Sequence, residues 1–222
     1  MKRALGAMAI TGAVLFGMSG CLLDDEERRD VDYGVGEPVQ VLVIEGRIGG
    51  ITVRGGGDAV KVAEHQNYRG AAPRSSHEVR DGTLTLRYDC DDCGVGYEVD
   101  VPAGTRVRVS AETGGVRLTG LAGEVEAKVG TGGVEASGLT SPVVRLSTGT
   151  GGIEASFAGS PDTVEARAET GGVRVRVPAG EAYAVDASAG TGDVSVEVPR
   201  RPGAVRSITA RTGTGGVTVG GV

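Results

Sequence analysis

The sequence predicts an all-β fold, a right-handed parallel β-solenoid with short coils of about 18–23 residues. A Thr-Gly turn followed by a β-branched residue recurs six times, and the residues around it fall into columns of constant character. The hydrophobic residues, 39% of the chain, are largely Val and Ala, with 3% aromatics and no Trp, which suits a thin core. The β-branched residues, spaced by 18, 19, 20, 21 and 23 positions, are Val116, Val134, Ile153, Val173, Val194 and Val217.

Each copy of the repeat reads as strand, tight turn, strand. A β-branched residue opens each copy, and the apolar residue two positions later points the same way because side chains alternate along a strand. One glycine position recurs in every turn, where a positive φ or crowding of backbones is expected. The outward residue between the two apolar ones alternates in charge over four copies and then changes: Arg108, Glu126, Arg145, Glu165, Asp186 and Thr209.

We expect successive copies to stack in chain order about 4.8 Å apart, so that each column becomes a ladder of neighbours. In the next outward column no two basic residues would then be adjacent; its members are Ser110, Lys128, Ser147, Arg167, Ser188 and Arg211. An antiparallel meander could use the same glycine-rich turns but would not align equivalent residues. The usual crossover preference makes the solenoid right-handed.

The N-terminus predicts export. Residues 1–20 have two basic residues and then an apolar run too short to span a bilayer, typical of a signal peptide. Gly17–Cys21 resembles a bacterial lipoprotein box, in which the Cys receives a diacylglyceryl group, although the pattern prefers Leu where Met18 stands. We therefore expect lipidation at Cys21, with an ordinary signal peptide as the alternative. The protein would then be extracytoplasmic and anchored to the bacterial cell membrane as a lipoprotein.

The rest of the chain divides into a linker and one domain. Residues 21–38 are highly charged and predict a solvated tether, and residues 39–222 predict a single β-solenoid domain. Within it, 63–96 reads as an irregular excursion plus a hairpin on the turn Asp81-Gly82. The last copy ends three residues before the C-terminus, which would leave a thin cap on an exposed edge.

Cys90 and Cys93 form a Cys-x-x-Cys pair among carboxylates. Outside the membrane, with no second Cys or His pair nearby, a small structural disulfide is the preferred interpretation. Half of a metal site and a redox pair are the alternatives.

The charge distribution bounds the partners. A formal net charge of −6 makes the chain a poor nucleic-acid binder. The segments between copies lengthen toward 197–207, where Arg200, Arg201 and Arg206 cluster. This candidate binding edge could meet an anionic envelope polymer or lipid headgroup; a solvated loop is the alternative.

No catalytic constellation emerges from the sequence, so we predict no enzyme, no cofactor and no metal site. Glu135 and Glu154 would be neighbouring carboxylates, which glycoside chemistry needs, but they also fit an imperfect charged face. The only histidines, His65 and His77, lack a Ser or Cys partner in a recognisable arrangement. The glycine-rich turns lead into strands, not helices, and lack a recurrent Asp, which argues against phosphate loops and calcium repeats.

The chain resembles the bacterial putative-adhesin domains of unknown function. The resemblance covers roughly 39–222 and rests on the Asp-Gly-x-Leu-x-Leu hairpin, the strand 97–102 and the iterated Thr-Gly-x-Val turns. It implies a β-solenoid at the cell envelope and carries over no catalytic residues. We therefore expect a non-enzymatic structural or adhesive module that binds an envelope polymer or a surface partner. An envelope-stress accessory or sensor and a carbohydrate-active β-helix enzyme are the alternatives.

Overall fold

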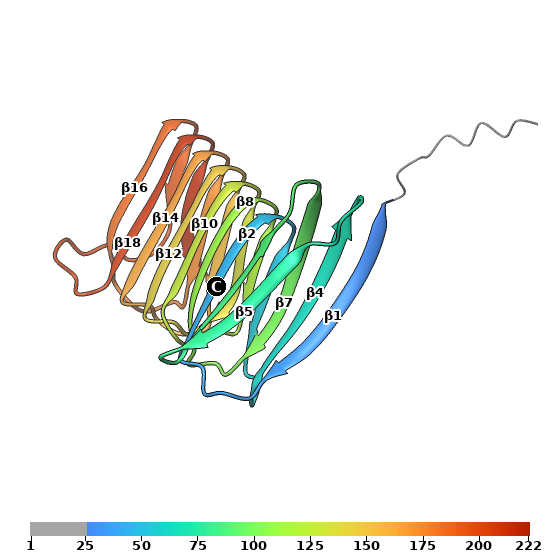
Figure 1. Ribbon diagram of the computed structural model, residues 1–222. Helices are drawn as coiled ribbons and strands as arrows, with labels where there is room; N and C mark the ends of the chain where they lie inside the picture. Colours follow the sequence, from blue (N-terminus) through green and yellow to red (C-terminus); the bar gives the residue numbers. More distant parts are fainter. Residues whose placement is uncertain (1–25) are drawn as a thin grey trace, which may run out of the picture.

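Residues 26–222 are described by a computed structural model, and every regular element in this range is a β-strand. The strands form two facing sheets that make up an elongated stack (Figure 1). The ten-stranded sheet has the order β1 (Glu27–Val35), β4 (Val60–Tyr68), β7 (Cys93–Val101), β3 (Ile51–Gly55), β9 (Val116–Thr119), β11 (Val134–Leu139), β13 (Ile153–Phe157), β15 (Val173–Val177), β19 (Val217–Gly221) and β17 (Val194–Val196). The nine-stranded sheet has the order β16 (Ala184–Thr191), β18 (Ser207–Thr214), β14 (Thr163–Thr170), β12 (Val143–Thr150), β10 (Val125–Thr131), β8 (Arg106–Thr113), β2 (Val41–Ile48), β6 (Thr83–Asp89) and β5 (Arg74–Arg80).

The predicted parallel β-solenoid is confirmed. Each coil of the stack places one strand in each sheet, and equivalent strands of neighbouring coils pair in parallel. The file Arg108, Glu126, Arg145 and Glu165 lies in register across β8, β10, β12 and β14, as the repeat predicts. Its ion pairs are long and exposed, with nitrogen–oxygen distances of 3.9 and 4.0 Å, so they add little to stability.

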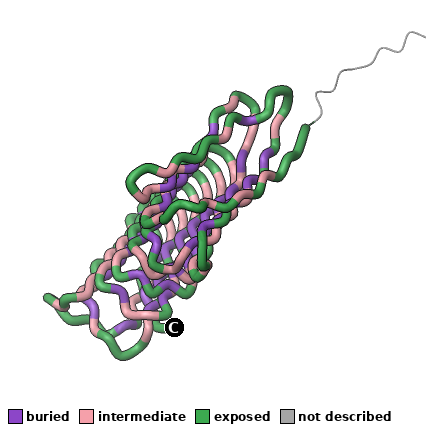
Figure 2. Tube along the Cα trace, turned by 60° about the horizontal axis from the view of Figure 1, so that its bottom comes forward, coloured by how far each residue is buried: buried purple, intermediate pink, exposed green. Residues whose placement is uncertain are grey.

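The core lies between the two sheets along the stack axis, where the buried positions concentrate (Figure 2). Each strand alternates buried and exposed residues, so the columns predicted to be apolar face inward. Val, Ala, Leu and Ile make up most of this core. The first inward column is 0–1% exposed at Val107, Val125, Val144, Val164 and Ile208.

The prediction that the copies stack in chain order is wrong for the last two. Strand β18 pairs with β14 on one side and β16 on the other, and β19 lies between β15 and β17. The sixth copy is therefore inserted between the fourth and the fifth. The segment 178–183 carries the chain past the place of one coil, and the longer segment 197–206 carries it back into that place. The fifth copy therefore forms the exposed end of the stack. The prediction that the C-terminal copy forms a thin cap at this end is wrong, because that copy is enclosed between two others.

This exchange also overturns the prediction that no two basic residues are adjacent. Arg167 and Arg211 are register partners on β14 and β18. Each is directed to a different carboxylate, Arg167 to Glu165 at 2.6 Å and Arg211 to Asp186. The two guanidinium groups are thereby compensated separately.

The charged segment predicted as a solvated tether over 21–38 contains strand β1, which pairs antiparallel with β4 over its whole length. Val31, Tyr33 and Val35 alternate with more exposed residues and are half-buried. The charge count concealed this alternation, because the charged residues occupy the outward positions and the exposed first half of the strand.

The region 63–96 is not an irregular excursion. Strand β4 lies antiparallel to both β1 and β7, and β5 and β6 form the predicted hairpin. Its turn residues Asp81 and Gly82 have φ values of 50° and 71°, the left-handed conformation that an Asp-Gly hairpin turn requires. The coil formed by β6 and β7 lies outside that of β2 and β3, so the chain also exchanges coil order at this end.

Candidate functional site

A groove runs along the stack on the face of the ten-stranded sheet and has a volume of about 790 Å³. It crosses the coils of β3, β9, β11, β13, β15 and β19, so its length is five strand spacings, or about 24 Å. Part of its floor is a row of exposed glycines, one from each coil, which we call the glycine row: Gly50, Gly115, Gly133, Gly152, Gly172 and Gly216.

The glycine row directly follows a second set of glycines that the fold requires. At Gly114, Gly132 and Gly151 φ is 141–144°, and a Cβ would lie 2.0–2.2 Å from the carbonyl oxygen of the neighbouring coil. These glycines occupy the turn position at which the sequence predicts a positive φ or crowding, and both conditions hold. The turn therefore depends on the first glycine of each pair.

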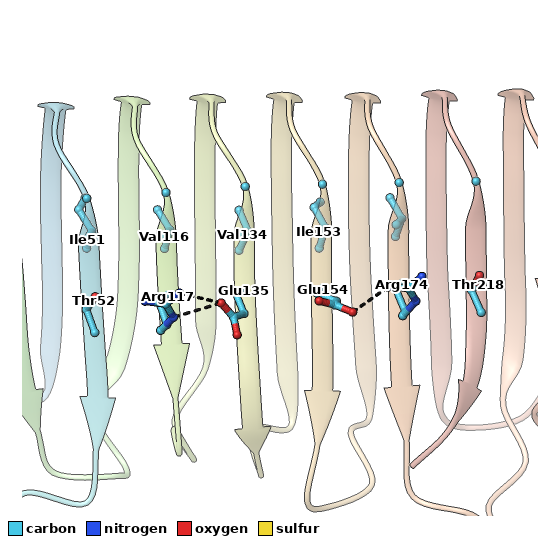
Figure 3. A pocket seen from close by; sticks show the side chains of 17 residues that line it. Ile51, Thr52, Val116, Arg117, Val134, Glu135, Ile153, Glu154, Arg174 and Thr218 are labelled. Carbon is cyan, nitrogen blue, oxygen red and sulfur yellow. Dashed lines mark hydrogen bonds and ion pairs between the residues drawn. The ribbon is translucent and has the colours of Figure 1, made fainter.

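A row of polar side chains borders the glycine row, as Figure 3 shows across the neighbouring strands. In spatial order it reads Thr52, Arg117, Glu135, Glu154, Arg174 and Thr218, and we call it the charged row. Arg117 lies 3.0 Å from Glu135, and Arg174 donates a hydrogen bond of 2.8 Å to Glu154. The two arginines balance the two carboxylates, so the row has no net charge.

Glu135 and Glu154 are register partners, the neighbouring carboxylates that the sequence predicts. The hydrogen bond from Arg174 lowers the pKa of Glu154 below its ordinary value, and burial, which acts in the opposite direction, is the smaller effect. A general acid in glycoside chemistry needs a raised pKa. The electrostatics of this pair therefore favour a charged binding surface over proton transfer.

A second cavity of about 650 Å³ continues from the groove at the β4 end and shares Gly50 and Thr52 with it. His65 lies on its wall, with Nδ1 2.8 Å from Asp30 and Nε2 3.6 Å from Glu98. The contact with Asp30 raises the pKa of His65. The other histidine, His77, stacks on Tyr33 with ring centroids 4.5 Å apart. His65 thus links β4 to its neighbours within one sheet, whereas His77 links β5 of one sheet to β1 of the other.

Comparisons with known proteins agree with this architecture. The sequence model of the family described as Toastrack DUF4097 matches residues 51–219 of this chain. The chain belongs to the Toastrack family. This match confirms the resemblance to the putative-adhesin domains of unknown function.

Among solved structures, the Toastrack chain is similar to a putative cell adhesion protein from Clostridium sporogenes, with a TM-score of 0.55 and 11% identity over 88% of this chain and 100% of that one. A putative adhesin from Bacteroides fragilis shows 15% identity and a TM-score of 0.45 over 90% and 99% of the two chains. Among curated proteins none matches the sequence significantly. At these identities the first likeness shows a shared fold.

The arginines of the predicted binding edge lie in or next to the loop of 197–206, which protrudes from the stack near its far end (Figure 1). Arg200 and Arg201 are exposed, whereas Arg206 is half-buried and pairs with Glu181 at 2.9 Å and Asp162 at 3.8 Å. One of the three charges of the Toastrack loop is therefore already compensated. Binding at this edge stays a prediction.

The remaining predicted sites concern cysteines and metals. Cys90 and Cys93 are joined by a disulfide, with Cα atoms 6.0 Å apart, between the end of β6 and the start of β7. Cys21 and the signal segment 1–20 lie outside the described residues. Between residues 26 and 222 no three His, Cys, Asp or Glu side chains are grouped as metal ligands. In the same range no helix could cross a membrane.

Sequence reasoning missed the groove of the Toastrack stack. It considered only the first glycine of each Gly-Gly pair, which needs a conformation closed to other residues, and drew nothing from the second. The fifth copy carried the signal, because Asp193 stands there at the second position. A position that accepts Asp in one copy does not need glycine for its fold in the others.

Proposed function

We propose that this Toastrack protein is a lipid-anchored cell-envelope protein whose β-solenoid is a non-enzymatic adhesive module. The groove carries the proposal, because it stays open over six coils and can hold a long polymer in extended form. The family match and the likeness to a structure described as a putative cell adhesion protein support it. The module would act outside the cytoplasm on an envelope polymer or a surface partner, with no nucleic acid involved.

Retention on purified cell-wall material tests the adhesive function. The full chain should sediment with wall fragments and remain in solution without them. Replacing Arg200, Arg201 and Arg206 with Ser tests whether the loop takes part; if the groove is the binding surface, retention stays unchanged. Failure of the parent protein to bind any wall fraction would overturn the adhesive function.

Anchoring through Cys21 is the second part of the proposal. The signal segment 1–20 and the lipoprotein-box resemblance at Gly17–Cys21 support it. Two acyl chains are enough for stable membrane attachment. Incorporation of radiolabelled lipid should occur in the parent and be lost in Cys21→Ala, with Cys90→Ala plus Cys93→Ala as the matched control that keeps the label. Equal labelling of parent and Cys21→Ala would overturn the anchor.

The far end of the stack favours one alternative, an envelope-stress accessory whose partner covers that end. Val194 in the last coil is 44% exposed, and Val185, Ala187 and Ala189 are only half-buried. A pull-down from envelope extracts with the parent and with Val194→Lys tests this reading. Loss of one specific partner in the variant would support it, and identical recovery from both proteins would contradict it.

A further inference from the structure

The glycine row is not explained by the fold. A Cβ added at these positions would meet its nearest atom at 3.5–4.0 Å, which is ordinary van der Waals contact. None of the six has a positive φ. Asp193 occupies the equivalent place in the fifth copy, where its carbonyl accepts the ladder hydrogen bond from Val217 as a glycine carbonyl would. Alanine would cost less conformational entropy there, so the fold alone would favour Ala over Gly.

Glycine at a site that tolerates side chains is typical of a backbone that another molecule must approach closely. The six glycines are exposed and follow one another along the stack, so together they keep a flat strip free of side chains. The charged row forms one border of this strip (Figure 3). Asp193 places a side chain in line with the strip at the far end and ends it there.

The floor has a defined hydrogen-bonding character. The carbonyl oxygen of every member of the glycine row accepts a hydrogen bond from the next coil, for example Gly152 from Val134 at 2.9 Å and Gly216 from Val173 at 2.9 Å. A peptide lying on the strip would find these carbonyls occupied, whereas strand addition needs free backbone groups. The floor therefore offers glycine CH₂ groups and peptide planes for contact with a flat ligand.

The border supplies polar groups without net charge. Arg117 and Glu135 are about half exposed, as are Arg174 and Glu154. Each pair uses only some of its donors and acceptors, so N–H groups and carboxylate oxygens remain for ligand hydroxyls. An anionic polymer would gain nothing from a neutral row and would be repelled by a protein of net charge −6.

We propose that the glycine row and the charged row form a binding site for an extended, neutral, hydroxyl-rich glycan that lies along the stack axis. Pyranose rings would pack flat on the glycine strip, and their hydroxyls would bond to the arginines and glutamates at its border. The inference rests on the proposed adhesive function and specifies its ligand class and its surface.

Titration with defined oligosaccharides tests the site. Isothermal titration of the full chain with cellohexaose and chitohexaose should show binding, and hexagalacturonate and a neutral Gly-Ser peptide of similar length should bind at least tenfold more weakly. Gly133→Gln with Gly152→Gln should lower the affinity for the neutral glycans at least tenfold, because two side chains then obstruct the strip. Gly36→Gln with Gly104→Gln is the matched control, since a Cβ at either residue meets nothing within 4 Å. Thermal melts establish that both variants fold; Gly133→Ala with Gly152→Ala replaces the first pair if it does not, with a smaller loss.

The outcomes separate the site from the function. Equal affinity in groove and control variants, preference for the anionic hexamer or the peptide, or no binding of either neutral hexasaccharide would overturn the glycan site. Retention of the parent on wall fragments in those cases would leave the adhesive function standing through another surface. If the groove variant loses both retention on wall fragments and hexasaccharide binding while the control variant keeps them, the glycan site and the adhesive function are both supported.

Discussion

The two ends of the stack are built differently. At the near end the sheets finish in the antiparallel strands β1 and β5, and β5 has Arg74, Glu78 and Arg80 on its exposed edge. At the far end they finish in the parallel strands β16 and β17 of the fifth copy, where Val194 is 44% exposed. Charged edge strands discourage pairing with other chains, whereas an open edge with few charges permits it.

The interior differs as well. Near β1 the space between the sheets contains Glu64 and Gln66, which are 2% and 4% exposed. The Tyr33 hydroxyl donates to Glu64 at 2.9 Å, and the Gln66 amide donates to the same carboxylate at 2.9 Å. Burial and this hydrogen bond raise the pKa of Tyr33. At the far end no such network is present among the described residues, and the apolar column is only partly covered.

This contrast shows that the near end is closed against further strand pairing, whereas the far end leaves strand edges and apolar side chains exposed. A polar network, a hairpin and a disulfide close the near end, at the cost of interrupting the repeat. The far end keeps the repeat to its last coil. Substitutions that are matched between the ends should therefore have unequal effects.

The largest difference is expected for truncation of a valine in each end coil. Val99→Ala on β7, at a position 0% exposed, should lower the free energy of unfolding by about 2 kcal/mol through lost burial and a residual cavity. Val194→Ala should cost less than about 0.5 kcal/mol because its side chain is already partly in water. Urea denaturation of both variants measures the difference. Equal losses would mean that the far end is covered in solution.

The disulfide should stabilise the near end alone. Cys90→Ser with Cys93→Ser opens a short loop between β6 and β7, and chain entropy predicts a loss of about 1–2 kcal/mol. Amide hydrogen exchange should speed up in β6 and β7 and stay unchanged in β16 and β17. Uniformly faster exchange along the whole stack would show that the two ends unfold as one unit.

A smaller, pH-dependent term is expected from His65, which joins β4 to Asp30 of β1. Because the contact with Asp30 raises its folded-state pKa, the stabilisation is complete below the unfolded value of about 6.5 and is lost as the pH rises through the folded pKa. His65 is 46% exposed, so the loss should be a few tenths of a kcal/mol. Melting temperatures between pH 5.5 and 8.5 should fall slightly more in the parent than in His65→Gln. Parallel pH profiles would contradict the assignment.

The smallest effect on stability is expected for Val194→Lys at the far end. A charge on this edge should leave the melting temperature almost unchanged and reduce self-association at high protein concentration. Sedimentation velocity of parent and variant measures this, with Lys61→Val at the near end as a control. If Val194→Lys leaves self-association unchanged, the protein associates through a surface other than the far end.

The repeat was sufficient to predict the parallel stack, the inward columns and the Glu135–Glu154 neighbourhood, because parallel stacking aligns equivalent residues of the copies whereas an antiparallel meander does not. It could not reveal β1, whose charges concealed a weak alternation. The groove was missed because its one sequence signal, Asp193 at the second glycine position, gains its meaning only when the φ values and the space around each glycine are known.

The exchanged order of the last two copies left a signal that was not used. Stacking in chain order would place Glu165 beside Asp186, two carboxylates in adjacent coils. The observed order inserts Thr209 between them. It also brings Arg167 beside Arg211, but each has its own carboxylate. Which of the two coil orders is more stable depends on the directions of these side chains, and the alignment of the repeats does not contain that information.

The order of the coils is the claim on which both the groove and the contrast between the ends depend. Cysteine pairs in a Cys21→Ser background test it directly, because adjacent strands place Cα atoms about 4.8 Å apart, within reach of a disulfide, and next-nearest strands do not. Oxidation should cross-link Glu165→Cys with Thr209→Cys, whose residues are register partners, and should leave Glu165→Cys with Asp186→Cys reduced. A cross-link in the second pair and none in the first would contradict the account.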